Sequence, residues 1–147
     1  RKQGDILSLQ ANLYRQLGTG MLDDAKKTLR SLIADVPYSN KKLASMDMEE
    51  RYRLIISTIL NAIGIRVEVE RMLATGRIDL VAWLSRYIYV IELKLSNNGG
   101  IAAAEQQITT CGYTEPFKGD TRKVVGLAVE LDSEGKGLID WKVVEEQ

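Results

Sequence analysis

Hydrophobic positions recur every three to four residues in the first part of the chain and then change to a run of alternating and continuous apolar segments. The helical spacing predicts a first helix over 5–17, which the sequence Gly18-Thr-Gly20 ends. A second amphipathic helix over 22–36 stops before Pro37, because the residue preceding a proline disfavours the helical conformation. The segment from Pro37 to Lys42 is therefore a predicted boundary.

A third helix is predicted over 47–63, with Asp47 as its N-cap and Glu50, three residues later, completing a capping box. Gly64 closes this helix. Glu49 falls beside the apolar stripe and is the acid that leans inward. Glu50 falls on the polar side, together with Arg53, Ser57 and Asn61.

Strand patterns follow, with β-branched, aromatic and aliphatic residues in short runs. The predicted strands cover 65–73, 77–84, 87–95, 123–131 and 138–144, and a helix over 101–112 separates the third strand from the fourth. This order of three helices, three strands, one helix and two strands predicts an α/β (α+β) fold, a mixed sheet with helices on both faces.

The second and third strands form a predicted hairpin around Ser85-Arg86. A short turn there pairs Leu84 with Tyr87, and the same register pairs Asp79 with Glu92 and Arg77 with Lys94. Since side chains alternate along a strand, all four charged residues share one face.

This register sets acid against acid and base against base, which is destabilising unless something compensates. One candidate is a divalent cation between Asp79 and Glu92, with Lys94 free to hold a water or a phosphate oxygen, because magnesium prefers few carboxylates and retained waters. The alternative is diagonal salt bridging on a solvated face, Asp79 with Lys94 and Arg77 with Glu92.

Both faces of the hairpin are apolar nearer the turn, so both should be covered. We expect the charged face to carry Val81, Trp83, Ile88 and Val90, and the other face to carry Ile78, Leu80, Ala82, Leu84, Tyr87, Tyr89, Ile91, Leu93 and Leu95. The charged cluster then lies at the end of a mostly buried ladder, where carboxylates are costly unless they are paired or bound to metal.

The composition excludes several kinds of active site. The chain of 147 residues has no histidine, which excludes imidazole zinc sites and catalytic triads, and it has no phosphate-binding glycine loop. No apolar run is long enough to span a membrane and no signal peptide pattern opens the chain, so we expect a soluble protein. The single cysteine, Cys111, fits a reducing cytoplasm.

The formal net charge of zero is divided unevenly. Residues 1–45 carry eight Lys and Arg against four Asp and Glu, and residues 46–147 carry twelve against sixteen. The second part therefore lacks the broad basic surface of a strong autonomous DNA-binding domain, and we expect the N-terminal helices or a partner domain to supply that affinity.

Three segments together resemble a known family: Gly76-Arg-Ile-Asp79, Ile88-Tyr-Val-Ile-Glu92-Leu-Lys94, and Gln107-Ile followed by Tyr113. They are similar to the PD-(D/E)XK nuclease superfamily, with its restriction-endonuclease-like fold. More narrowly, they resemble the nuclease-like C-terminal domain of prokaryotic proteins whose N-terminal part is similar to an AAA-type ATPase. Because the chain begins at Arg1 without Met, we expect residues 1–45 to be a helical annex from a preceding region and 46–147 to be the nuclease-like domain.

The resemblance implies Asp79 and Glu92 as magnesium ligands, with the Leu93 carbonyl as a third and Mn²⁺ as a substitute ion. It implies that Lys94 orients or activates the attacking water and that Glu49 is an accessory acid acting through water. Gln107 and Tyr113 would line the cleft, although the spacing between them is longer than in the QxxxY motif of exonuclease relatives. The residue before Asp79 is Ile, where this superfamily commonly has Pro.

The expected function is hydrolysis of DNA phosphodiester bonds by a magnesium-dependent nuclease domain attached to an ATPase-like region of the same protein. Two alternatives remain open: a catalytically silent module with the same fold that serves in binding or regulation, and a purely structural α/β interaction domain.

Overall fold

The computed structural model describes residues 3–37 and 45–146. Its helices and strands occur close to the predicted positions, and the part of the predicted boundary that follows Pro37, up to Lys42, lies outside the described residues. The elements are α1 (Gln3–Thr19), α2 (Leu22–Ala34), α4 (Met48–Ala62), β1 (Arg66–Leu73), β2 (Gly76–Trp83), β3 (Tyr87–Leu95), η1 (Ser96–Asn98), α5 (Gly100–Thr110), η2 (Glu115–Phe117), β4 (Lys123–Leu131) and β5 (Leu138–Glu146).

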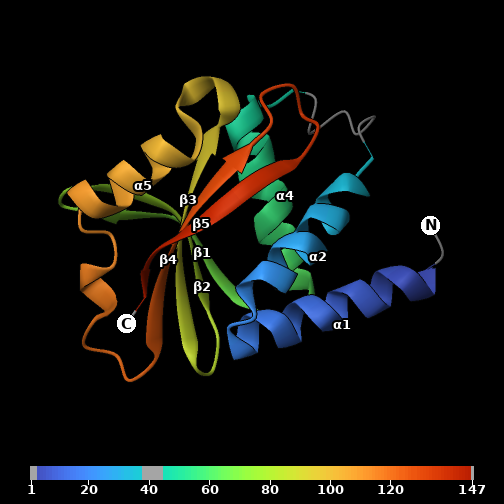
Figure 1. The fold of residues 1–147 in the computed structure, drawn as a ribbon, viewed down its shortest axis with the longest axis horizontal. Helices are drawn as coiled ribbons and strands as arrows, with labels where there is room; N and C mark the ends of the chain where they lie inside the picture. Colours follow the sequence, from blue (N-terminus) through green and yellow to red (C-terminus); the bar gives the residue numbers. More distant parts are fainter. Residues whose placement is uncertain (1–2, 38–44, 147) are drawn as a thin grey trace.

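The five strands form one mixed sheet in the order β1-β2-β3-β4-β5. Neighbouring strands are antiparallel except β3 and β4, which are parallel and are joined by the crossover helix α5. In Figure 1, α5 lies on one face of the sheet, and α1, α2 and α4 lie on the other. This arrangement confirms the predicted α/β class with helices on both faces.

Two hydrophobic clusters hold the layers together. The larger one joins the sheet to α1, α2 and α4, and it includes Leu13, Leu29, Ile56 and Leu93. The smaller one joins the other face to α5 and η2. Residues of α1 and α2 thus share a core with the sheet, and the division into an annex and a nuclease-like domain stays a prediction.

The predicted faces of the hairpin are confirmed with one exception. Val81, Ile88 and Val90 pack on the α5 side as expected, but Ile78 packs with them, although alternation placed it with Leu80 on the opposite side. The departure coincides with an irregularity in β1, where Glu70 has a φ of 56° and the regular β1–β2 pairing is interrupted. The β2–β3 ladder has also ended at Leu80, so Ile78 lies outside the regular pairing on which the prediction of its face depended.

The N-cap of helix α4 is Asp47, as predicted. The Asp47 side chain accepts a hydrogen bond from the Glu50 N–H at 2.9 Å, which satisfies one of the free donors of the first turn. Because α4 packs against β1, β2 and β3, its first two turns are carried to the end of the sheet at which Asp79 and Glu92 lie.

Among the described residues, no helix is long and apolar enough to cross a lipid bilayer.

Candidate active site

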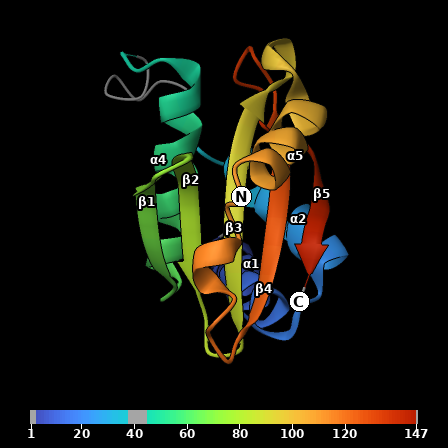
Figure 2. The ribbon, with the colours of Figure 1, turned by 90° about the vertical axis from the view of Figure 1, so that its left-hand side faces the viewer.

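The strands β2 and β3 separate where the predicted charged residues begin. The ladder runs from the Trp83–Ile88 pair to the Leu80–Ile91 pair and ends there, in the register predicted from the turn. Figure 2 shows the two strands close together near the turn and diverging toward their other ends. The predicted direct pairings of Asp79 with Glu92 and of Arg77 with Lys94 are therefore both wrong, because that part of the hairpin is open.

Asp79 replaces the missing ladder bond. In the register of the hairpin, the next backbone hydrogen bond would join the Leu93 N–H to β2. The structure instead has the Leu93 N–H donating to Asp79 Oδ2 at 2.9 Å. The carboxylate of Asp79 thus reaches into the gap between the strands and is fixed there, with the residue only 3% exposed.

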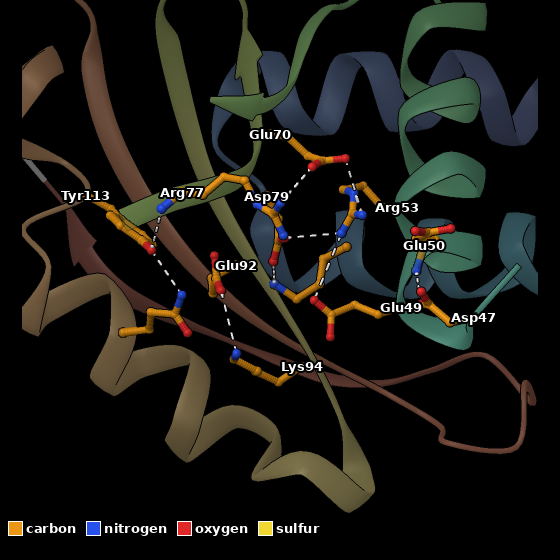
Figure 3. Close-up of polar contacts among 12 residues, drawn as sticks. Asp47, Glu49, Glu50, Arg53, Glu70, Arg77, Asp79, Glu92, Lys94 and Tyr113 are labelled. Carbon is orange, nitrogen blue, oxygen red and sulfur yellow. Dashed lines mark hydrogen bonds and ion pairs between the residues drawn. The ribbon is translucent and has the colours of Figure 1, made fainter. Parts of the chain in front are cut away.

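Glu92 stands beside Asp79 on β3 and is 2% exposed. Its Oε2 atom lies 3.9 Å from the Lys94 ammonium, but its Oε1 atom is buried and has no hydrogen-bond partner. A buried carboxylate oxygen without a partner is rare, since burial removes its hydration. The neighbouring carboxyl group of Asp79 interacts with Glu92 and raises its pKa further. Figure 3 shows these side chains grouped together in the gap.

The acids of the site resist ionisation. Burial, helped by the neighbouring charge of Asp79, raises the pKa of Glu92 to about 9, and Lys94 only partly opposes this shift. Burial also raises the pKa of Asp79, against the Leu93 N–H and Arg53. The pKa of Glu49 is raised by burial and by Asp79. Without a further positive charge in the site, the ionised forms of these three acids are therefore disfavoured.

Most of the predicted site residues line one open pocket of about 400 Å³. Glu49 enters it from α4, Asp79 from β2, and Glu92 and Lys94 from β3. Gln107 and Tyr113 line the same pocket from α5 and the segment after it.

Tyr113 is completely buried, and its hydroxyl oxygen accepts hydrogen bonds from the Gln107 amide at 2.9 Å and from the Arg77 N–H at 3.2 Å. A Cβ atom at position 76 would lie 2.7 Å from this oxygen. Gly76 therefore leaves the space that the Tyr113 hydroxyl occupies. Tyr113 and Gln107 thus fix the start of β2 against α5.

The diagonal salt bridges that were the alternative to a metal site are not formed. Arg77 pairs with Glu70 at 2.9 Å and does not pair with Glu92, while Asp79 is 3.4 Å from Arg53. Neither Arg53 nor Glu70 was predicted as part of the site. Arg53 was placed on the polar side of its helix together with Ser57, yet the two are only 7% and 5% exposed, because β1 and β2 cover that side.

A local signal for Arg53 did exist in the sequence, since Glu49 and Arg53 are four residues apart on one helix and can pair. Glu70 has no such signal, because its role depends on the path of β1 beside α4.

The donors suit a hard divalent cation. Asp79 and Glu92 supply carboxylate oxygens, one of which has no partner. Within residues 3–37 and 45–146, no three His, Cys, Asp or Glu side chains are placed to share an ion. Such an ion would need backbone oxygen and water to complete its shell, and this ligand set is typical of Mg²⁺.

Comparisons with known proteins assign the chain to a family. No solved structure matches this chain. A curated relative, described as an uncharacterized protein in the vnfD 5′ region of Azotobacter chroococcum mcd 1, is 21% identical over 141 residues. The match covers 94% of this chain but only 27% of the relative, so the chain spans about a quarter of that protein. The family model of the PD-(D/E)XK nuclease superfamily matches residues 47–141, which include Asp79, Glu92 and Lys94, and the chain belongs to this superfamily.

Proposed function

We propose that this chain is a magnesium-dependent nuclease domain that hydrolyses DNA phosphodiester bonds. The observation that supports the proposal most strongly is the buried, unpartnered Glu92 Oε1 beside Asp79, at the mouth of the gap between β2 and β3. A cation bound there would give that oxygen a partner and would allow both carboxyl groups to ionise.

Asp79, Glu92 and the Leu93 carbonyl would hold the ion, with Mn²⁺ as a substitute for Mg²⁺. The Leu93 N–H points toward β2, where it meets Asp79. In an extended strand the N–H and C=O of one residue point to the same side, so the Leu93 carbonyl is also directed into the gap between the strands. Its oxygen is therefore a suitable third ligand.

A bound divalent cation supplies charge neutralisation at the scissile phosphate and lowers the pKa of a coordinated water. Lys94, 18% exposed and next to Glu92, would donate a hydrogen bond to the attacking water or to a phosphate oxygen. Glu49, which lines the same pocket and whose pKa is raised by burial, would hold a second water. Gln107 and Tyr113 would keep the cleft in shape through their hydrogen bond.

Cleavage assays test this assignment. Supercoiled, single-stranded and branched DNA would be incubated with the wild-type chain and with Mg²⁺ or Mn²⁺. We expect Asp79→Asn and Lys94→Met each to lower the rate by roughly 100-fold or more, as is typical when a charge at the reacting phosphate is removed.

Matched controls are Asp23→Asn and Lys136→Met, which remove an exposed carboxylate of α2 and an exposed lysine of the β4–β5 loop. Both should cleave at the wild-type rate. Equal activity of the wild type and either site variant would refute the assignment.

DNA affinity would come partly from elsewhere. Residues 46–147 carry four more acidic than basic groups, and phosphate binding depends on positive charge. The matched relative is about three and a half times as long as this chain. We therefore propose that an ATPase-like region of the same protein brings DNA to this domain.

The same negative charge favours a second candidate, a catalytically silent module that serves in binding or regulation. Titration calorimetry with Mg²⁺ distinguishes the two. A working site should bind Mg²⁺ and lose the binding in Asp79→Asn, whereas a silent module should show no binding that depends on Asp79.

A further inference from the structure

Arg53 is an internal cation of the site. It is 7% exposed, and its guanidinium group faces three carboxylates from three elements. Nη1 lies 3.4 Å from Asp79 Oδ1 and 3.9 Å from Glu49 Oε1, and Nη2 lies 3.3 Å from Glu70 Oε1. Figure 3 shows Arg53 on the side of Asp79 that is turned away from Glu92.

Glu70 is held in an unusual conformation to make its contact. Its φ of 56° lies in the left-handed region, which residues other than glycine seldom adopt and which costs about 1–3 kcal/mol. In the register of β1 and β2, Glu70 stands opposite Asp79, where the regular pairing is interrupted. Its carboxylate binds Arg53 and Arg77 together, so this conformation brings a third acid to the guanidinium.

The two oxygens of Asp79 therefore have different surroundings. Oδ2 is fixed by the Leu93 N–H on the strand β3, and Oδ1 faces Arg53. In two-metal nucleases, a shared carboxylate joins two cations roughly 3.5–4 Å apart. Here the Arg53 Nη1 atom lies between Asp79 and Glu49, where a second cation shared by these two acids would otherwise lie.

We propose that the Arg53 guanidinium takes the place of a second divalent cation, so that the site binds one divalent cation and Arg53 orients Asp79 toward it. This inference rests on the proposed function, because it presupposes the first cation at Asp79 and Glu92. Arg53 is a positioning residue in this role, since it reaches the reacting atoms through Asp79. Arginine suits the role because its planar guanidinium can meet several carboxylates at once and stays protonated when buried.

The test is the number of Mn²⁺ ions bound per chain. Titrations followed by the electron paramagnetic resonance signal of free Mn²⁺ would compare the wild type with Arg53→Gln, Arg53→Lys and Arg86→Gln. We expect one ion per wild-type chain, and two per chain in Arg53→Gln, which leaves Glu49, Glu70 and Asp79 without their shared cation. Arg53→Lys retains a positive charge and should bind one ion.

Arg86→Gln is the matched control, because Arg86 is an exposed arginine in the turn between β2 and β3, far along the hairpin from the site. It should bind one ion. Circular dichroism would check the folding of every variant.

If Arg53→Gln does not fold, the double variant Arg53→Gln with Glu70→Gln removes part of the excess negative charge and still leaves Asp79 and Glu49 to share an ion. It should also bind two ions.

The outcomes separate this inference from the function on which it rests. Two ions on the wild-type chain, both lost in Asp79→Asn, would overturn the role of Arg53 and leave the nuclease proposal standing. One ion on both the wild type and a folded Arg53→Gln chain, or on the folded double variant, would also overturn it. Absence of any Mn²⁺ binding to the wild type would remove the proposed metal site itself.

Discussion

Single atoms at the start of β2 set the shape of the pocket. Gly76 lies against the Tyr113 hydroxyl, which is held by the Gln107 amide and the Arg77 N–H. These contacts tie the strand that carries Asp79 to the helix on the far side of the pocket. A methyl group at position 76 would be 2.7 Å from the Tyr113 oxygen and 3.3 Å from its ring, so the hydroxyl is the atom that leaves no space.

Gly76→Ala should therefore destabilise the protein by about 1–3 kcal/mol, as is typical of overpacking, and it should lower cleavage by moving β2. Tyr113→Phe alone should cost about 1 kcal/mol, because it removes a hydrogen-bonded hydroxyl. In the Tyr113→Phe background the alanine should cost clearly less. Urea unfolding of the four proteins measures this coupling, and strictly additive effects would show that the close contact is not the cause.

The N-cap of helix α4 supports the charged residues that this helix contributes to the pocket. Its first turns carry Glu49 and Arg53, and Asp47 satisfies the Glu50 N–H at the helix start. Fraying of this end would release Glu49 first and would then loosen Arg53 from Asp79. The cap therefore matters for the site although the Asp47 side chain does not line the pocket.

Asp47→Ala should lower the free energy of unfolding by about 1 kcal/mol, the usual cost of losing an N-cap. Asp47→Ser and Asp47→Asn should retain most of the stability, because their side chains can accept the same bond. Chemical denaturation measures the effect, and hydrogen exchange at the Glu50 amide should be faster in the alanine variant only. An unchanged exchange rate at that amide would speak against the cap.

The packing of α1 against the sheet depends on a buried tyrosine. Tyr89 on β3 is fully buried, stacks on Tyr87 with ring centroids 5.6 Å apart, and donates a hydrogen bond to the Leu17 carbonyl of α1. Burial raises the pKa of the Tyr89 hydroxyl well above its ordinary value of 10.0. The folded protein therefore keeps this group neutral under conditions in which the unfolded chain ionises it.

The sign of the pH dependence follows directly. Below pH 10 the group is neutral in both states, and above pH 10 only the unfolded chain loses the proton, so the free energy of unfolding should fall as the pH rises. Tyr89→Phe should show a shallower fall between about pH 9.5 and 11, although it is less stable at neutral pH. Denaturation series across this range measure both slopes, and equal slopes would exclude Tyr89 as the responsible group.

Local patterns predicted much of this chain. The turn at Ser85-Arg86 set the hairpin register, and the Leu84 N–H does bond to the Tyr87 carbonyl, at 2.9 Å. The same register predicted that Asp79 and Glu92 lie close together, because residues that are neighbours in space within one short hairpin are also close in sequence. Residues that meet across longer separations were missed. Arg53 and Asp79 are 26 positions apart, and only the packing of α4 on the sheet brings them together.

The sequence by itself determined the helices, the strands, the hairpin frame and the acids and lysine that lie near its end, because each depends on periodicity, turn chemistry or capping among close neighbours. Three features were decided by the tertiary structure alone. They are the point at which β2 and β3 separate, the packing of Ile78 on the α5 side, and the burial of Arg53 among three carboxylates. These features arise when desolvation and charge pairing outweigh local regularity, and both depend on elements that are far apart along the chain.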